Sequence, residues 1–147
     1  MNEAEFFKIV DYILLKGAEA TMNLTSDFKA DFVDIFAKNE DEFEELKQWL
    51  HTHGKVVHSK PSGDTVRLDK PHSTPYGPLQ YLKIRPFDPS KPFRGAPDFE
   101  VDYEKMKTEH PELKQIQSQL YEMLELKGDD VLVYFLKPTV SELFDEK

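Results

Sequence analysis

Three short segments in the middle of the chain alternate polar with apolar residues, and this pattern most constrains the fold. The segments are TVRLDK, YLKIRPF and PDFEVDY. Their polar positions are Thr65, Arg67 and Asp69, then Tyr81, Lys83 and Arg85, then Asp98, Glu100 and Asp102. Successive side chains of a strand point to opposite faces of a sheet. The pattern therefore predicts a sheet with one face against a core and a charged face opposite.

Helical periodicity appears before and after these strands. Apolar residues recur at three- and four-residue spacing over residues 2–21, 40–53 and 111–126, which is typical of amphipathic helices. Pro111 suits a first helical turn, and Gly128 suits a helix end. Each helix has one apolar stripe, so we expect all three to pack on one face of a mainly antiparallel sheet.

The remaining segments complete an α+β fold. Residues 30–38 and 79–87 read as strands, KVVHSK and TVRLDK form a hairpin around PSGD, and the apolar run 130–138 predicts a strand buried on both faces. We expect one α+β domain over residues 1–147, built on a curled β-α-β-β-β core at about 30–87. An N-terminal helix and a C-terminal helix-strand extension complete it. The predicted core residues are Val33, Ile35, Phe43, Leu46, Leu50, Val66, Leu68, Leu82, Ile84, Val131 and Val133.

The composition excludes several classes of protein. The chain has no cysteine, which excludes disulfides, thiolate metal sites and a cysteine nucleophile. Its net charge of −9 argues against nucleic acid as a partner. We expect no membrane partner, because no long apolar run is present, and the acidic start lacks the cations of a signal peptide. These features predict a cytoplasmic protein.

The charges are unevenly distributed along the chain. Residues 55–94 carry eight Lys and Arg against three acids, and both flanking segments are acidic. A cationic middle segment is suited to holding a small anion. The alternative is that these cations neutralise the acidic flanks in the folded chain, because surface ion pairs are common and individually weak.

The order of elements carries a resemblance to a known family. The stretch ADFVDIFAKNEDEFEELKQWLHTHGKVVHSKPSGDTVRLDKP, followed by LQYLKIRPF, resembles the β-α-β-β-β module of the vicinal oxygen chelate superfamily, which includes glyoxalases and extradiol dioxygenases. The resemblance covers roughly residues 30–103 and implies a sheet that curls around a cleft. PDFEVDY is similar to the first strand of a second module, but a long predicted helix and one strand follow it. We therefore expect no complete second module.

The same resemblance makes the family's metal chemistry doubtful here. Its metal ligands are a His on the first strand of a module and a Glu on the last. In this chain the His-like positions fall on Phe32 or Asp34 and on Asp98, and the Glu-like position falls on Lys83. A lysine repels a divalent cation. We therefore predict no metal and no cofactor.

Other candidate motifs are weaker. His51, His53 and His58 have the composition of a zinc site, but residues two apart do not share a helix face. No glycine-rich phosphate loop or nucleophile elbow is present. Asp98 and Glu100 can act as an acid–base pair, or they can simply face Lys83 and Arg85 as cross-strand partners.

Three functional hypotheses remain open. The first is a domain that binds a small anionic ligand in the sheet cleft without metal. The second is an enzyme of the same fold that uses Asp34, Asp98 or Glu100 as a base, and the third is a protein interaction module. A homodimer is expected in each case, because a lone module leaves an edge strand uncovered. The candidate ligand-binding residues are Arg67, Tyr81, Lys83, Arg85, Arg94, Asp98 and Glu100.

Overall fold

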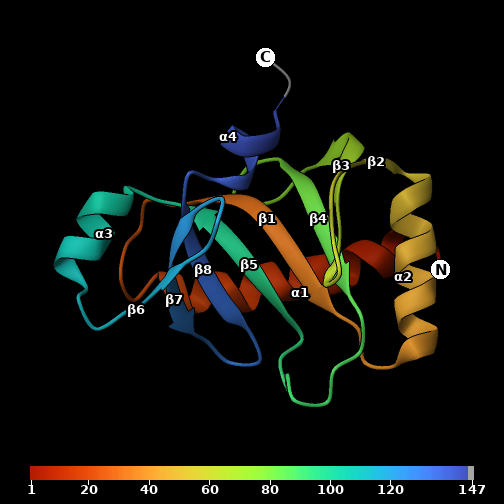
Figure 1. Cartoon of the computed structure of the whole chain (residues 1–147), viewed down its shortest axis with the longest axis horizontal. Coiled ribbons are helices and arrows are strands. Elements are labelled where there is room, and N and C mark those ends of the chain that lie inside the picture. The colour runs from red at the N-terminus through yellow and green to blue at the C-terminus, as the bar shows by residue number, and fades with distance from the viewer. Residues whose placement is uncertain (146–147) are drawn as a thin grey trace.

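The computed structural model describes residues 1–145 and confirms an α+β fold (Figure 1). Within these residues, eight strands form one mixed sheet in the order β2-β3-β4-β1-β5-β8-β7-β6. The elements are α1 (Glu3–Thr21), β1 (Lys29–Phe36), α2 (Glu40–Thr52), β2 (Gly54–Lys60), β3 (Gly63–His72), β4 (Leu79–Arg85), β5 (Gly95–Glu100), α3 (Tyr103–Glu109), β6 (Lys114–Gln117), β7 (Glu122–Lys127), β8 (Leu132–Lys137) and α4 (Val140–Phe144).

The sheet is built from two β-α-β-β-β modules. The first module is β1-α2-β2-β3-β4, and the second module is β5-α3-β6-β7-β8. In each module the first strand pairs in parallel with the last, β1 with β4 and β5 with β8. The modules meet where β1 and β5 pair antiparallel at the centre of the sheet. The module predicted at residues 30–87 is therefore confirmed, whereas the expectation that no second module is complete was wrong.

The helix predicted at residues 111–126 was also wrong, because β6 and β7 occupy this segment. These strands pair antiparallel, and β7 pairs along its whole length with β8. Leu124 is fully buried in the core, while Tyr121 and Met123 pack on the opposite side of the sheet. Strand pairing outweighs the helix propensity of this Gln-, Glu- and Leu-rich segment. The helix of the second module is instead α3, and the strand predicted at 97–103 ends at Glu100.

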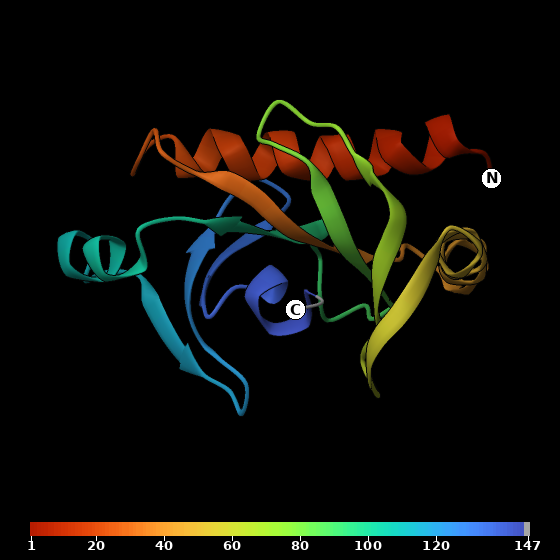
Figure 2. The ribbon, with the colours of Figure 1, turned by 90° about the horizontal axis from the view of Figure 1, so that it is seen from above.

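Helix α1 covers the convex face of the sheet and joins the two modules (Figure 2). Its buried side chains include Phe6, Val10 and Ile13, which belong to one core with residues of both modules. Gly17 lies inside the helix rather than at its end, and a Cβ there would lie 2.4 Å from Cγ of Pro97. The glycine therefore allows α1 to approach β5 closely.

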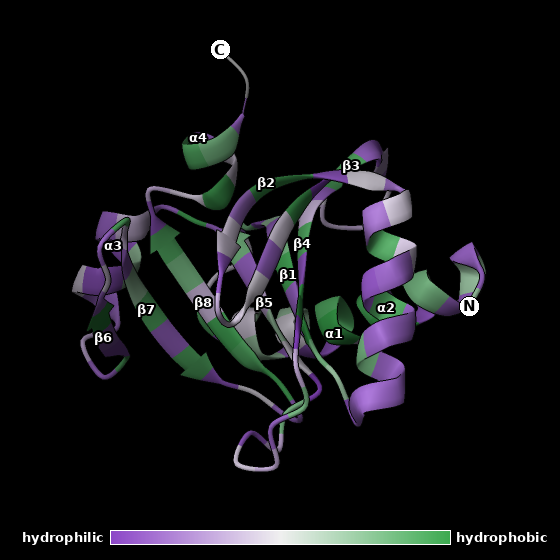
Figure 3. Ribbon diagram, turned by 45° about the vertical axis from the view of Figure 1, so that its right-hand side comes forward, coloured by the Kyte–Doolittle hydropathy of each residue, from purple (hydrophilic) through white to green (hydrophobic). Residues whose placement is uncertain are grey.

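Helix α2 lies over β2, β3 and β4, with a mostly hydrophilic ribbon in Figure 3. Asn39 caps it, since its Oδ1 accepts a hydrogen bond of 2.8 Å from the Glu42 backbone N–H. Leu46 and Leu50 are fully buried as expected. Phe43, predicted as core, is only partly buried at the edge of the cluster. No helix within residues 1–145 is both long and apolar enough to cross a membrane.

The two faces of the sheet follow the predicted alternation. Leu82 and Ile84 lie in the core beneath the helices, as do Val33 and Ile35. Lys83 lies on the opposite face, yet it is only 7% exposed. The charged face is therefore not simply solvated. The run predicted to be buried on both faces alternates as well, because Leu132 and Tyr134 in β8 are only half-buried.

Strand β1 departs from strict alternation at one point. Its pairing with β5 shifts register between Ala30 and Phe32, as at a β-bulge. Ala30 packs in the main core. The next two residues both face the concave side of the sheet: Asp31 bonds to α4, and Phe32 packs on Val140 of α4. The bulge thus places two successive side chains on the same face.

Candidate functional site

The concave face of the sheet holds a cleft between the two modules. Two adjoining hollows of about 100 Å³ and about 60 Å³ form it. In Figure 2 the sheet curls around this side, with α1 on the opposite side and α4 within the curve. The residues that line both hollows are Phe32, Asp34, Arg85, Asp98, Tyr121 and Leu136.

Strand register arranges the floor of the cleft in rows. One row runs across β4, β1, β5 and β8 and consists of Tyr81, Phe32, Asp98 and Tyr134. In the next row Lys83 of β4 lies opposite Asp34 of β1. The parallel pairing of β1 with β4 therefore brings a carboxylate and a cation together from segments about fifty residues apart.

Asp34 and Arg85 form an ion pair in the floor. The Arg85 Nε donates to Oδ2 of Asp34 over 2.5 Å, and the guanidinium lies 5.6 Å from the centre of the Phe36 ring. Asp34 is only 5% exposed, and its second oxygen, Oδ1, is buried without a hydrogen-bonding partner among residues 1–145. Burial raises the pKa of Asp34, while the charges of Arg85 and Lys83 act in the opposite direction. The pKa is raised overall, and the direct ion pair with Arg85 limits the rise.

Asp98 lies in the same cleft in a different environment. It is 6% exposed and lines both hollows. No side chain or backbone group within residues 1–145 donates a hydrogen bond to its carboxyl group. Burial, and then the nearby charges of Asp31 and Asp34, raise the pKa of Asp98 well above its ordinary value. The neutral form of this acid is therefore favoured.

Lys83 is a buried cation beside this acid pair. Its Nζ donates a hydrogen bond of 2.7 Å to Oγ of Ser62, from the turn between β2 and β3. Burial lowers the pKa of Lys83, and the charge of Asp34 opposes that shift. A buried ammonium needs a compensating charge or several hydrogen bonds.

Aromatic side chains of the second module line the side of the cleft that faces the first module. Tyr121 precedes β7, and Tyr134 lies in β8 beside Asp98. The Tyr134 hydroxyl donates to Oε2 of Glu125 over 2.9 Å. Burial and this hydrogen bond raise the pKa of Tyr134. The phenol therefore stays neutral at physiological pH.

Helix α4 covers one end of the cleft. Asp31 accepts a hydrogen bond of 2.8 Å from the Val140 backbone N–H and one of 2.5 Å from the Ser141 hydroxyl. Phe144 stacks on His58 of β2 at 5.4 Å between ring centres. These contacts hold α4 against both a central strand and an edge strand. The helix therefore covers one end of the cleft, and the open part lies around Asp34 and Asp98.

The structure brings only some of the predicted site residues together. Lys83, Arg85 and Asp98 line the cleft. Tyr81 lies beneath α4 and donates a hydrogen bond of 2.5 Å to Asp145, while Arg67 lies opposite Tyr81 in the neighbouring strand. Both therefore contribute to the covered end of the cleft rather than to its open part.

Two predicted site residues lie elsewhere. Arg94 is buried at the end of the loop between the modules, where its guanidinium bonds to Glu42 at 2.8 Å and to the Phe36 carbonyl at 2.8 Å. Glu100 is exposed at the end of β5. Neither lines the cleft. Glu100 also cannot partner Lys83 or Arg85 across neighbouring strands, because β1 lies between β4 and β5.

The set of predicted ligand-binding residues missed several side chains of the cleft, among them Asp34, Tyr121 and Tyr134. Asp34 was detectable, because it lies between Val33 and Ile35 in an alternating strand and so shares the face of Lys83. Tyr121 and Tyr134 were missed because the second module was not recognised.

A family metal centre does not fit these residues. By register, the positions equivalent to the family's ligands hold Phe32 and Asp98 on the first strands and Lys83 and Leu136 on the last. This set offers one carboxylate, one cation and two apolar side chains, whereas divalent ions require several oxygen or nitrogen donors. Within residues 1–145 no group of three His, Asp or Glu is placed to hold a metal ion.

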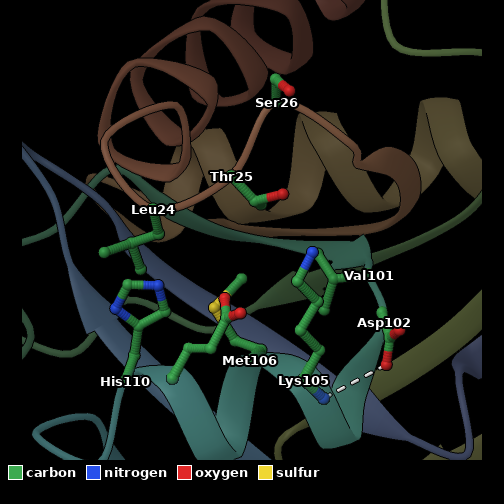
Figure 4. A pocket seen from close by; sticks show the side chains of 9 residues that line it. Leu24, Thr25, Ser26, Val101, Asp102, Lys105, Met106 and His110 are labelled. Carbon is green, nitrogen blue, oxygen red and sulfur yellow. Dashed lines mark hydrogen bonds between the residues drawn. The ribbon is translucent and has the colours of Figure 1, made fainter.

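Another hollow lies between the loop after α1 and helix α3 (Figure 4). Thr25 and Ser26 line it from the loop, and Lys105, Met106 and His110 line it from the α3 side. Its charged groups are exposed and at least partly satisfied locally, since Asp102 caps α3 and His110 contacts Glu112 at 3.2 Å. It has no buried, unpartnered polar group, in contrast to the cleft.

Comparisons with known proteins found similarity only to solved structures. No protein-family model and no curated protein matches this chain. A solved structure described as "Structural Genomics, Protein EC4020" aligns with a TM-score of 0.62 and 12% identity, over 88% of this chain and 85% of that chain. A glyoxalase/bleomycin resistance protein/dioxygenase superfamily member from Vibrio splendidus 12B01 aligns with a TM-score of 0.42 and 11% identity, over 76% of this chain and 97% of that one.

The strand order itself defines the class of fold. Two β-α-β-β-β modules side by side in one curled sheet form the vicinal oxygen chelate fold, which the sequence resemblance implied. The likeness to the first solved structure supports this architecture at an identity that shows the fold alone. Because a fold hosts many activities, function has to be argued from the cleft.

Proposed function

We propose that the cleft binds a small molecule with one anionic group, which Lys83 and Arg85 hold without a metal ion. The observation that carries the proposal is the imbalance of buried charge. Two basic side chains, Lys83 and Arg85, lie beside one carboxylate that makes an ion pair, Asp34, whereas Asp98 makes no ion pair within residues 1–145 and burial raises its pKa. A buried surplus cation is costly, and a bound anion removes that cost.

The geometry of the two cations supports the same reading. Arg85 uses Nε to bond Asp34, and its side chain is 32% exposed, so the other guanidinium nitrogens remain available to a ligand. A planar guanidinium is well matched to a carboxylate or phosphate. Phe32, Leu136 and Tyr121 provide apolar contacts beside it. A ligand with one anionic end and a small apolar body fits this lining.

A thermal-shift experiment with small anions tests the proposal. Phosphate, benzoate and 2-oxobutanoate are added separately to the wild-type protein, to Lys83→Met and to Lys70→Met. Lys70 is an exposed cation at the end of β3 and serves as the matched control. We expect at least one anion to raise the Tm of wild type and Lys70→Met but not of Lys83→Met, because ligands stabilise the state that they bind.

Two results would remove the proposal. One is that none of the three anions raises the Tm of wild type. The other is that Lys83→Met responds as strongly as Lys70→Met. Stoichiometric zinc, iron or manganese in protein purified without chelators would contradict the metal-free part.

Homodimerisation and a cytoplasmic location remain predictions. The uncovered edge of a lone module no longer argues for a dimer, since β5 of the same chain covers the edge of β1. The sheet still ends at β2 and β6, and uncovered edges favour association. Light scattering on purified protein tests the dimer, and microscopy of the tagged protein in its own cell tests the location.

A further inference from the structure

The cleft contains two buried carboxyl groups in different surroundings. Asp34 bonds to Arg85 through Oδ2, which lowers its pKa against the effect of burial, and its Oδ1 has no donor within residues 1–145. Asp98 has no cation in contact and no hydrogen bond within residues 1–145, and burial raises its pKa well above the ordinary value. When the surroundings of two nearby acids give them different pKa values, the acid with the lower pKa is suited to accept a proton and the other to donate one.

Register places the two groups at a useful separation. Asp34 lies opposite Ala96, and Asp98 is two residues further along β5 on the same face. Diagonal neighbours of this kind are about 7–8 Å apart at the backbone. A single reacting centre with its carbonyl group fits between two such side chains.

We propose that Asp34 and Asp98 act as base and acid in the keto–enol tautomerisation of a bound 2-oxo acid. The inference rests on the proposed function, because Lys83 and Arg85 hold the carboxylate of this substrate. A 2-oxo acid matches the cleft in three respects. It has one anionic group for the cations, a carbonyl oxygen that accepts a hydrogen bond from neutral Asp98, and a side chain for the wall formed by Phe32, Tyr121 and Leu136.

The proton and electron movements balance without another reagent. Oδ1 of Asp34 takes a proton from the carbon beside the carbonyl. The electrons of that C–H bond form the C=C bond, and the carbonyl π electrons move to oxygen. Asp98 gives its proton to this oxygen, and the positive charges of Lys83 and Arg85 stabilise the enolate that forms on the way. Exchange with water then returns a proton to Asp98 and removes one from Asp34.

Deuterium exchange measures this activity directly. Phenylpyruvate and 2-oxobutanoate are incubated in D₂O with and without protein, and proton NMR follows loss of the signal of the hydrogens beside the carbonyl. We expect wild type to accelerate exchange of at least one probe above the protein-free rate. Asp98→Asn should reduce that acceleration at least about 100-fold, the usual range for a general acid or base. It should still show the anion-induced rise in Tm.

Glu100→Gln is the matched control, because Glu100 is an exposed acid on the same strand as Asp98. Its exchange rate and its anion response should equal those of wild type. Asp34→Asn provides a second test of the base and should also lose exchange.

The outcomes separate this inference from the binding proposal. Anion-induced stabilisation without accelerated exchange of either probe overturns the catalytic inference and leaves binding intact. If neither anion-induced stabilisation nor accelerated exchange is observed, both the binding proposal and the catalytic inference are overturned. Exchange that persists in Asp98→Asn at the wild-type rate shows that Asp98 is not the acid, and this also overturns the inference.

Discussion

The first and second modules share one strand order but line the cleft with different chemistry. Among residues 1–145, every Lys and Arg that lines the cleft belongs to the first module or to the loop that follows it. The second module contributes Asp98, Tyr121 and Tyr134. The first module and the loop after it therefore supply the cations and Asp34, and the second module supplies Asp98 and the two tyrosines.

Equivalent positions make the contrast sharper. Phe32 and Asp98 pair with each other across the central strands, and each lies opposite a tyrosine of its own last strand. Two residues beyond those tyrosines, the first module has Lys83 and the second has Leu136. The repeated backbone fixes where side chains meet, while the side chain at each position is free to differ. An asymmetric site can thus form on a nearly symmetric scaffold.

The largest expected effect tests whether the two modules unfold as one unit. Leu82 in the first module and Leu124 in the second are both fully buried in the core that α1 completes. We expect Leu82→Ala and Leu124→Ala each to lower the free energy of unfolding by about 2–5 kcal/mol. Denaturant titration, followed by fluorescence of the single tryptophan, Trp49, is the measurement. Because Trp49 is in the first module, a Leu124→Ala transition identical to wild type would show that the modules unfold separately.

The second test concerns the ion pair within the first module. Arg85→Ala leaves Asp34 buried without its partner, and we expect a loss of about 1–3 kcal/mol, moderated by the partial exposure of Arg85. Asp34→Ala combined with Arg85→Ala should cost less than the sum of the two single changes. Additive losses in denaturant titrations would mean that the pair is not coupled. The partner of Arg85 is Asp34, and not the Asp98 or Glu100 that the sequence suggested.

The third test uses the pH dependence of stability that Asp98 of the second module causes. The pKa of Asp98 is raised in the folded protein, so the folded state binds its proton more tightly than the unfolded state. Its contribution is therefore most favourable at low pH. That contribution falls by about 1.4 kcal/mol per pH unit from near pH 4 up to the folded-state pKa, and is constant above it. Asp98→Asn should flatten this decline relative to Glu100→Gln in urea titrations between pH 4 and 8, and equal slopes would contradict the assignment.

The smallest effect on stability is expected for a substitution that gives the first module the apolar residue of the second module at the equivalent position. Lys83→Leu removes a buried ammonium and copies the apolar residue at the equivalent position of the second module. We expect the free energy of unfolding to change by less than about 1.5 kcal/mol in either direction, because replacing a buried charge by an apolar group is often neutral. The anion response should nevertheless disappear. A large loss of stability would show that the Ser62 hydrogen bond is structurally essential.

Local pattern was sufficient for most of the first module and for α1. Alternation correctly placed Val33, Ile35, Leu82 and Ile84 in the core, because each lies in a strand with one covered face. It failed over residues 111–126, where Leu113, Leu120 and Leu124 have spacings that a helix also allows. There the pairing of β7 with β8 decides the structure, and such pairing cannot be read from local spacing.

The candidate site was harder to predict than the core for a related reason. Lys83 and Arg85 were found from alternation, but their partner Asp34 depends on the parallel pairing of β1 with β4. Arg94 was assigned to the site by charge alone, whereas its guanidinium binds Glu42. Which charges meet is set by the order of strands in the sheet, and local sequence does not give that order.

The bulge in β1 has a consequence for insertions and deletions. Asp31 is the extra residue that shares a face with Phe32, so its removal would leave every other side chain of β1 on its present face, and only the hydrogen bonds between Asp31 and α4 would be lost. Removal of Val33 would instead move every side chain on one side of the deletion to the opposite face, so that Asp34 would point into the core. We therefore expect chains of this fold to differ in length at residue 31 far more readily than at any later position of the strand.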